Sequence, residues 1–359
     1  MGEYLWKDTN LALIGSDEDK KFRKHIAEYE PAWKNVESIN CPTLIVWRVK
    51  NFGLEPVATK DHGKFYNGDS YIVLKAEKKG NKLVYNIHFW IGRYSTQDEY
   101  GTAAYKTVEL DALLLNAAIQ HREVDGYESK MFSSYFTKIE KLTGGYPSGF
   151  RNSEKGIFKP RLLVFHGVDN KHTVLTEVPF ARKAVSSDDV FVLDLGIKAY
   201  QWNGNGANKD ERYRASLYLQ QLKSERLGRC QTFVVDESDG EGTAEFFSHL
   251  PDAALPRSKA EQGVGRRAIY RLSDETGKLK VTLMCEDRLD KSVLTQDDAY
   301  FIDTGKALFV YIGEKCSRNE KRNAFSYANA YLKQTNHPFV PITVVSGNMD
   351  SDELAQVLE

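Results

Sequence analysis

Three pairs of carboxylates recur along the sequence, each with its Glu at one fixed distance from a glycine, and could hold a metal ion. In each pair an Asp stands just before a run of β-branched and aromatic residues that is typical of a buried strand. The Glu always follows, by seven residues, the glycine that ends the next such run. The pairs are Asp69 with Glu99, Asp189 with Glu211, and Asp298 with Glu320, and the glycines are Gly92, Gly204 and Gly313. Carboxylate oxygens of this kind, joined by neighbouring backbone carbonyls, favour calcium over magnesium.

The same pairs have a purely structural alternative. A turn Asp and a Glu in the first turn of a helix both make local hydrogen bonds, and the Glu suits the helix dipole. A repeated spacing preserves a structural role as well as a metal site, so the spacing alone leaves both interpretations open. None of the loops has the alternating ligands and central glycine of an EF-hand. A calcium site in this chain would therefore draw its ligands from separate segments.

Three repeated units must position these carboxylates. Each unit opens with a strand, continues with the two strand runs around the Asp, and then enters a long helix near the Glu. A short amphipathic helix closes each unit. The opening strands are expected at 44–49, 162–166 and 268–272, and the closing helices at 128–136, 242–250 and 350–358. The expected fold class is α+β, with three repeats that each pack a central mixed β-sheet between a long and a short helix.

Changes in composition place the boundaries between the units. A joint between the first two units contains Gly, Pro and Lys, and a longer linker before the third is rich in Ala, Pro, Gly and charge. Three domains also agree with a length of 359 residues. The expected order is a polar lead-in at 1–39, domain one at 40–150, the joint at 151–160, domain two at 161–250, the linker at 251–267 and domain three at 268–359.

Charge and cysteine usage limit the partners and the compartment. Lys and Arg number 49 and Asp and Glu number 50, so the net charge of −1 argues against bulk attraction to nucleic acid or an anionic membrane. The four cysteines include no CxxC pair, which disfavours a structural zinc site and agrees with reduced thiols. No stretch has the length of a membrane span, and the first residues lack the apolar run of a signal peptide. We expect a cytoplasmic protein that is not an integral membrane protein.

Several motifs in these repeats resemble the gelsolin family. Residues 67–75 read NGDSYIVLK and residues 88–92 read HFWIG, which look like the gelsolin repeat. Residues 95–99, STQDE, and 120–124, QHREV, closely resemble the first gelsolin domain. Residues 31–34, PAWK, resemble the three-domain severin- and fragmin-like members, and the resemblance runs from about residue 30 to the last residue.

The resemblance implies an activity on actin. Members of the family bind actin monomers and filaments, sever filaments and cap their barbed ends under calcium control, so the protein is expected in the cytoplasm and cytoskeleton. Nucleation of filaments is compatible with this reading. A calcium-regulated capper that does not sever is the closer alternative.

An enzyme is the alternative from a different class. Gly204, Asn205 and Gly206 follow a strand and open a helix, as a nucleotide-binding turn would. The third glycine of such a turn is missing, because Lys209 stands there. A plain turn is therefore favoured, and no catalytic residue is assigned.

The resemblance also implies calcium ligands at matching positions. The family has one site per domain and a further site between the first domain and actin. The implied ligands of domain one are Asp69 and Glu99 with the carbonyls of Gly68 and Tyr146. Those of domain two are Asp189 and Glu211 with the Asp188 carbonyl, and those of domain three are Asp298 and Glu320 with the Asp297 carbonyl. At the actin side they are Asp111 and the carbonyls of Asn116 and Ala118, where Asn116 replaces a frequent Gly.

The long helix of the first unit, expected at 97–115, has two apolar faces. Ala103, Thr107, Leu110 and Leu114 form a stripe that should pack on the domain's own sheet, while Lys106 and Glu109 should face away. The second stripe consists of Ala104, Tyr105, Val108, Ala112 and Leu115. A second intramolecular neighbour, such as the lead-in, would explain it as well as a binding partner would. The resemblance favours insertion into the cleft between actin subdomains. The implied actin contacts on this helix are Ala104, Tyr105, Val108, Asp111, Ala112 and Leu115.

Basic residues elsewhere suggest two further contacts. The long helix of the second unit carries Lys209, Arg212 and Arg214, which by charge alone read as a solvated face. The resemblance makes them contacts to the side of the filament. It also implies a phosphatidylinositol bisphosphate site near the joint, although neighbouring Glu residues dilute it and weak lipid control is expected. The implied lipid contacts are Lys138, Lys141, Arg151, Lys155, Lys159 and Arg161.

Overall fold

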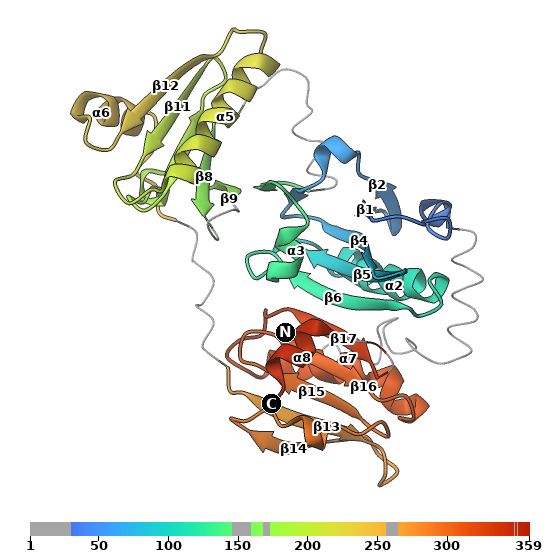
Figure 1. Ribbon diagram of the computed structural model, residues 1–359. Coiled ribbons are helices and arrows are strands. Elements are labelled where there is room, and N and C mark those ends of the chain that lie inside the picture. Colours follow the sequence, from blue (N-terminus) through green and yellow to red (C-terminus); the bar gives the residue numbers. More distant parts are fainter. Residues whose placement is uncertain (1–29, 146–158, 168–172, 256–264, 348, 350) are drawn as a thin grey trace. The chain divides into compact units, whose positions relative to one another are not determined.

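The chain forms two compact units in the computed structural model (Figure 1). The structure describes residues 30–145, 159–167, 173–255, 265–347, 349 and 351–359. Unit 1 contains Met1–Lys60, Asp69–Tyr135 and Glu261–Glu359, and unit 2 contains Asp61–Gly68 and Phe136–Ala260. The first and third repeats therefore share one unit, and the second repeat is built separately.

Unit 1 is organised around one sheet of ten strands. The first repeat supplies five strands in the order β6-β5-β4-β1-β2, and the third supplies β14-β13-β15-β16-β17. In both halves one pair, β5 with β6 and β16 with β17, is parallel and the other pairs are antiparallel. The strands are β1 Thr43–Lys50, β2 Gly53–Pro56, β4 Ser70–Lys79, β5 Lys82–Ile91, β6 Ala118–Val124, β13 Ala268–Ser273, β14 Lys280–Glu286, β15 Ala299–Asp303, β16 Leu308–Ile312 and β17 Ile342–Ser346.

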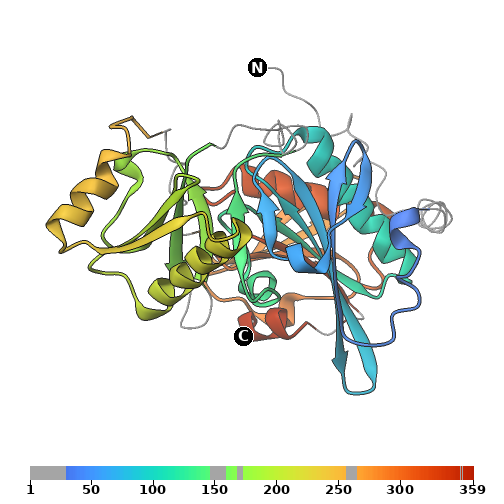
Figure 2. The same cartoon turned by 90° about the horizontal axis from the view of Figure 1, so that it is seen from above.

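Helices cover both faces of this sheet. The long helices α2 (Gln97–Leu113) and α7 (Arg318–Lys333) pack on one face through Leu110 and Leu332, which are fully buried. The short helices α3 (Lys130–Ser134) and α8 (Asp352–Val357) lie on the other face. The long β4–β5 hairpin, drawn in light blue in Figure 2, projects from the sheet. The expected α+β arrangement of a sheet between a long and a short helix is confirmed in both repeats.

The two halves of the sheet join through β6 and β17, which pair antiparallel with Ile342 opposite Arg122 and Val344 opposite Gln120 (Figure 1). Arg122 is buried and reaches across the junction, donating to the Asn329 side chain and to the carbonyls of Pro338 and Val340. The junction therefore combines backbone pairing with a buried guanidinium.

A stacked pair of imidazoles, His88 and His121, lies buried beside this junction and is called the junction histidines below. Nδ1 of His121 lies 3.1 Å from the Thr343 hydroxyl of β17, and Nδ1 of His88 lies 2.9 Å from Oε1 of Glu123. Burial lowers the pKa of His88 to about 3 and that of His121 well below its usual range. Burial also raises the pKa of Glu123 to about 8. The cluster therefore favours neutral groups.

Unit 2 contains a sheet of seven strands in the order β12-β11-β10-β8-β9-β7-β3. Its long helix α5 (Lys209–Glu225) and short helix α6 (Gly240–Ser248) pack on opposite faces around two separate apolar clusters. The strands are β3 Lys64–Tyr66, β7 Ile139–Leu142, β8 Arg161–Gly167, β9 Thr173–Val178, β10 Val190–Asp194, β11 Lys198–Asn203 and β12 Gln231–Asp236. Strands β3 and β7 come from the sequence expected to form domain one, so that segment extends the sheet of the second repeat.

A capping box begins each of the three long helices. The side chains of Glu99, Glu211 and Glu320 accept from the backbone of the N-cap residue, and the N-cap side chain accepts in return. Helix α2 ends at Leu113, two residues before the expected end. Leu115 and Asn116 have φ angles of 59° and 57°, which a right-handed helix does not allow. Within the described residues, we find no helix whose length and apolar character would let it cross a bilayer.

Candidate functional site

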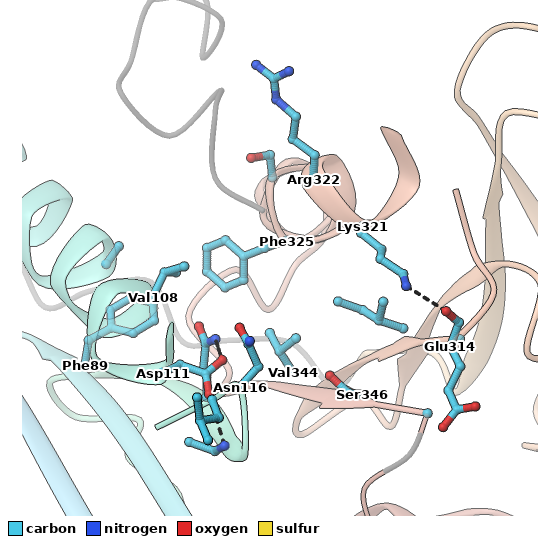
Figure 3. A pocket seen from close by; sticks show the side chains of 18 residues that line it. Phe89, Val108, Asp111, Asn116, Glu314, Lys321, Arg322, Phe325, Val344 and Ser346 are labelled. Carbon is cyan, nitrogen blue, oxygen red and sulfur yellow. Dashed lines mark hydrogen bonds between the residues drawn. The ribbon is translucent and has the colours of Figure 1, made fainter. Parts of the chain in front are cut away.

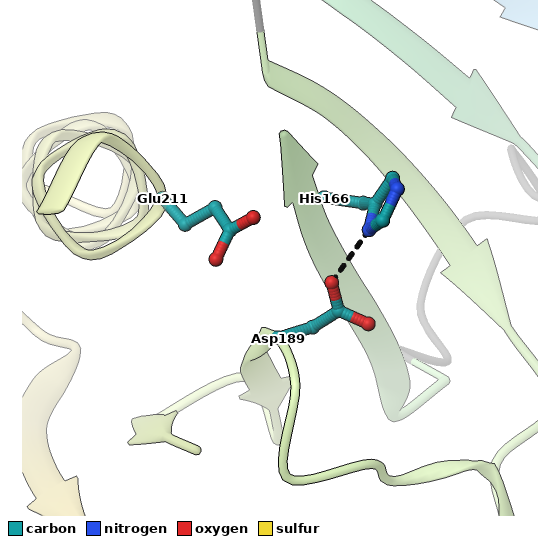
Figure 4. A group of neighbouring side chains, drawn as sticks. All are labelled: His166, Asp189 and Glu211. Atoms are coloured by element: carbon teal, nitrogen blue, oxygen red, sulfur yellow. Dashed lines mark hydrogen bonds and ion pairs between the residues drawn. The ribbon is translucent and has the colours of Figure 1, made fainter. Parts of the chain in front are cut away.

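The second repeat brings three possible metal ligands together (Figure 4). The carboxylates of Asp189 and Glu211 face the imidazole of His166, and one ligand atom from each lies within 4.8 Å of the others. They come from the turn before β10, the first turn of α5 and strand β8. Asp188, whose carbonyl is the remaining implied ligand, is the residue before Asp189. The expected convergence of the two carboxylates is present here.

The third repeat gathers three carboxylates. The negative charge of Asp298 contributes, after burial, to raising the pKa of Glu320, so the two groups are within electrostatic reach. Asp274, which follows β13, also raises that pKa, while its own amide donates to Glu320 Oε1 at 2.8 Å. Asp297 precedes Asp298 in the chain, as the implied carbonyl ligand requires. Such crowding of negative charge is relieved by a divalent cation, so these residues fit calcium.

In the first repeat the Asp is already neutralised. Asp69 is fully buried and pairs with the guanidinium of Arg48. Its chain neighbour Ser70 hydrogen-bonds Ser95, which donates to Oε2 of Glu99 at 3.2 Å. This linkage holds Asp69 and Glu99 in one region of unit 1. The other implied ligands of this site are Gly68, whose amide donates to the Gly144 carbonyl, and Tyr146, which lies outside the described residues.

The constant Gly-to-Glu spacing has a structural origin in all three repeats. The carbonyls of Gly92, Gly204 and Gly313 accept from the amides three residues later, at 3.0, 3.1 and 3.2 Å, and the capping box that follows places each Glu. A Cβ at Gly204 would stand 2.2 Å from a backbone oxygen, so a side chain cannot be placed there. The structural alternative for the carboxylates is therefore present in the geometry. It does not exclude a metal, because a carboxylate oxygen that accepts one hydrogen bond keeps a further lone pair.

The face of α2 that was expected to pack on its own sheet does so. Ala103, Thr107 and Leu110 are fully buried, and Leu114 is nearly so. On the second stripe Ala104 and Ala112 are buried, Tyr105 and Val108 are half-buried, and Leu115 is 72% exposed. The second stripe therefore has a partly covered surface rather than a filled core around it.

The expectation that Lys106 and Glu109 face away from the protein is wrong. Both are buried, and Lys106 Nζ donates to Oε2 of Glu30 at 2.6 Å and to Oε1 of Glu109 at 2.9 Å. The indole of Trp33 also donates to Glu109, at 2.8 Å, and stacks edge-on against Trp47. The segment expected as a polar lead-in thus covers a third side of α2, and its charged neighbours are satisfied inside the fold.

A cleft of about 510 Å³ separates the second stripe of α2 from the third repeat (Figure 3). Val108 and Phe89 line one wall, and Phe325 of α7 and Val344 of β17 line the other. The rings of Phe89 and Phe325 are 5.9 Å apart. Within unit 1 this stripe of α2 therefore faces the third repeat, the intramolecular neighbour that the sequence left open.

Asp111 lies at the floor of the same cleft, beside Asn116 and Ala118 (Figure 3). Its carboxylate accepts from the Ala118 amide at 3.0 Å and from the Gln120 side chain at 2.8 Å. The φ of Asn116 is positive, a conformation that Gly adopts freely and that Asn tolerates better than most residues. The three implied ligands therefore lie close together, in the last turn of α2, in the turn that follows it and at the start of β6.

Comparison with known proteins gives the same three-fold division. The gelsolin repeat model matches residues 51–133, 171–242 and 280–354. Severin from Echinococcus granulosus is 48% identical over 354 residues, which cover 96% of this chain and 94% of the relative. The chain belongs to the gelsolin family. Gelsolin-like protein 2 from Lumbricus terrestris is 45% identical (94% of this chain, 93% of the relative), and the actin depolymerising venom protein gelsolin 1 from Platymeris rhadamanthus is 34% identical (82% of each).

The basic residues of the second gelsolin repeat are only partly available. Lys209 is exposed at the start of α5, and Arg214 is half-buried. Arg212 donates to the Gly204 carbonyl and lies 3.6 Å from Asp236. Arg226, which follows the helix, is tied to Asp194 by two short hydrogen bonds. Lys209 and Arg214 are therefore the stronger candidates for a filament contact.

Acidic side chains pair with part of the basic set that is implied in lipid binding. Lys138 pairs with Glu140 and lies over the Tyr218 ring, and Arg161 pairs with Asp194 at 2.9 Å. Lys159 is exposed. Of the remaining implied contacts, Lys141 is half-buried, and Arg151 and Lys155 lie outside the described residues.

The glycine turn that suggested a nucleotide site has no free amides for a phosphate. Gly204 and Gly206 donate to the carbonyls of Asp189 and Ser187, and Asn205 donates to the Glu237 carboxylate at 2.8 Å. A phosphate-binding turn needs several such amides pointing at the ligand. The turn is therefore a structural one.

Sequence reasoning missed three residues of these sites. His166 and Asp274 stand on or directly after opening strands, and Arg122 lies on the strand that joins the repeats. Aligning the opening strands would not have singled out His166, because Val164 holds the position of Arg48 and Arg271 in the strand register. No local pattern identifies Arg122 as a junction residue.

Proposed function

We propose that this protein binds actin monomers and filaments, severs filaments and caps their barbed ends under calcium control. The observation that carries the proposal is the second stripe of α2, which is apolar, borders an implied calcium site and faces a cleft. An amphipathic helix of this kind suits insertion into a groove on a partner. The names of the relatives, Severin and an actin depolymerising protein, support actin as that partner.

The closed form of the proposed switch is the continuous sheet of unit 1. Pairing of β6 with β17 holds the third repeat against α2, so the stripe that would enter actin is partly covered. Calcium shifts the population toward an open form if it binds that form more tightly. The ligands for this step are the carboxylate pairs of the three repeats.

The number of carboxylate pairs agrees with the free energy that the switch requires. Moving an equilibrium from 1:99 to 99:1 takes about 5.5 kcal/mol. One site that exists only in the open form, held at 100 times its dissociation constant, supplies about 2.7 kcal/mol. One site is therefore too few, and two or three suffice.

The first two repeats then have separate roles. The second repeat binds the side of the filament through Lys209 and Arg214, and the first repeat inserts α2 between actin subunits at the barbed end. Asp111 and the turn that follows α2 add a calcium ion at the contact between α2 and actin. Control by phosphatidylinositol bisphosphate is weak, because acidic neighbours pair with part of the basic set. The protein works in the cytoplasm, on the cytoskeleton, and performs no chemical reaction.

Single filaments watched by fluorescence microscopy test this function. The wild-type protein should break filaments and stop growth at their barbed ends in calcium. The variant Val108→Asp places a charge on the second stripe and should lose both effects. The matched control is Val281→Asp, at an exposed valine of β14, which should act like the wild type. Capping without breakage would support the alternative of a non-severing capper, and equal activity of Val108→Asp would refute the role of α2.

A further inference from the structure

The Asp of each repeat has a basic partner, and the partner differs in the second repeat. In the first and third repeats it is an arginine of the opening strand, Arg48 for Asp69 and Arg271 for Asp298. Asp189 instead contacts Nδ1 of His166 at 2.6 Å. A guanidinium offers only donors and stays protonated, so it cannot ligate a metal. A neutral imidazole is the commonest nitrogen ligand for metals in proteins.

The positions of the three side chains suit a small cation (Figure 4). Glu211 is fixed by the amides of Gly167 and Asn208, which donate to its two oxygens at 2.7 and 2.9 Å. The Asp189 side chain is 17% exposed and that of His166 is 63% exposed. The buried carboxylate is therefore preorganised, and the exposed imidazole has room to rotate. Ligands at about 2.1 Å from a tetrahedral ion lie about 3.4 Å apart, which is within the 4.8 Å limit that encloses the three ligand atoms.

We propose that the second repeat binds a transition-metal dication, with zinc as its best probe, through His166, Asp189 and Glu211. One imidazole nitrogen with two carboxylate oxygens matches the ligand preference of zinc, and water can fill the fourth position. Calcium gains little from a nitrogen ligand, because it prefers oxygen. In the described part of the chain, this is the one cluster of three His, Cys, Asp or Glu residues with ligand atoms this close.

Zinc at this position excludes calcium from the second repeat. Both ions would use Asp189 and Glu211, so they compete for one site, while the carboxylate pairs of the other repeats have arginine partners and stay selective for calcium. The inference goes beyond the proposed function. It does not depend on the calcium switch, because zinc can enter the site in the absence of calcium and its ligands include a residue, His166, that calcium does not need.

Calorimetric titration of the full-length protein with zinc chloride, in parallel with calcium chloride, tests the proposal. The wild type should bind zinc, and His166→Gln should weaken this binding at least about tenfold. His166→Arg is the sharper variant, because a guanidinium can pair with Asp189 but cannot ligate a metal. It should keep the pairing with Asp189 and the thermal midpoint of the wild type, and it should lose zinc binding. Calcium binding to the other repeats should be unchanged in both variants.

His62→Gln is the matched control within unit 2 and should bind zinc like the wild type. Zinc held by thiols such as the exposed Cys41 would be insensitive to both His166 variants, and that result would overturn the proposal. So would wild-type zinc affinity in His166→Arg. Failure of the calcium titration alone would count against the calcium switch and leave the zinc result intact.

Discussion

The junction of β6 and β17 should weaken strongly when Arg122 is replaced by alanine. Its guanidinium makes three hydrogen bonds across the junction, at 2.7, 2.8 and 3.1 Å. A hydrogen bond to a charged group contributes about 1.5–3 kcal/mol, and bonds that share one group are not additive. We therefore expect a loss of about 2–4 kcal/mol. At about 1.4 kcal/mol per tenfold, opening becomes roughly 30- to 700-fold more favourable.

Amide hydrogen exchange in EGTA measures this opening directly. Exchange of amides that bond across the junction should accelerate by the same factor, because its rate follows the opening equilibrium. Amides of the central strand β4 should keep their protection. The matched control is Arg93→Ala, which removes an ion pair with Asp125 inside the first repeat and should leave the junction unchanged. Junction exchange within threefold of the wild type in Arg122→Ala would refute the reasoning.

The same change should alter the calcium requirement of the switch. If the closed form is favoured about 100-fold without calcium, the expected loss brings the two forms near parity. Arg122→Ala should then act on actin filaments in EGTA, where the wild type is inactive. An unchanged calcium midpoint, together with accelerated exchange, would mean that junction opening and actin binding are separate events.

Three further predictions follow from buried groups. Trp33→Ala should lower the free energy of unfolding of unit 1 by about 3–5 kcal/mol in a denaturant titration, because it removes a buried indole and its bond to Glu109. Between pH 7 and 5 each junction histidine should lower the free energy of unfolding by about 2 kcal/mol. The reason is that its pKa is depressed in the folded protein, so only the unfolded chain takes up the proton. Glu123, whose pKa is raised to about 8, has the opposite effect and raises the free energy of unfolding by about 2 kcal/mol over the same range. Glu123→Gln should therefore lose about 2 kcal/mol more stability than the wild type between pH 7 and 5. Glu320→Gln should keep the capping box but lose about 2.7 kcal/mol of calcium-induced stabilisation at 100 times the dissociation constant, measured by thermal unfolding.

Each of these predictions has an outcome that would contradict it. Tyr94→Ala, at an exposed aromatic ring, is the control for Trp33→Ala and should leave the free energy of unfolding of unit 1 unchanged. If Trp33→Ala changed that free energy no more than Tyr94→Ala does, Trp33 would not belong to the core. Equal pH slopes for Glu123→Gln and the wild type would mean that Glu123 is ionised when folded. Glu314→Gln is the control for Glu320→Gln, and full calcium stabilisation in the latter would exclude Glu320 as a ligand.

Local patterns in the sequence predicted most of the architecture. The recurring Asp, Gly and Glu identified the strand pair and the start of each long helix, because the turn after each Gly and the capping box fix the Gly-to-Glu spacing. Periodicity also predicted which stripe of α2 packs on its own sheet. The end of α2 was placed two residues too late, since no residue there breaks a helix as Gly or Pro would, and the turn depends on left-handed Leu115 and Asn116.

Contacts between distant segments could not be predicted in this way. Lys106 and Glu109 read as solvent-facing because their partners, Glu30 and Trp33, lie more than seventy residues earlier in the chain. The pairing of β6 with β17 joins segments more than two hundred residues apart, and nothing local in either strand specifies the other. The role of His166 could not be predicted either, because it depends on the contact of its imidazole with Asp189.

The central claim, calcium-controlled severing and capping of actin, is tested most directly by the loss of fluorescence from pyrene-labelled filaments diluted below the critical concentration. The protein should be added in calcium and, separately, in EGTA. Accelerated loss in calcium alone is predicted, because severing creates new ends. Slowed loss would mean capping without severing, and no effect in either buffer would contradict the assignment to actin.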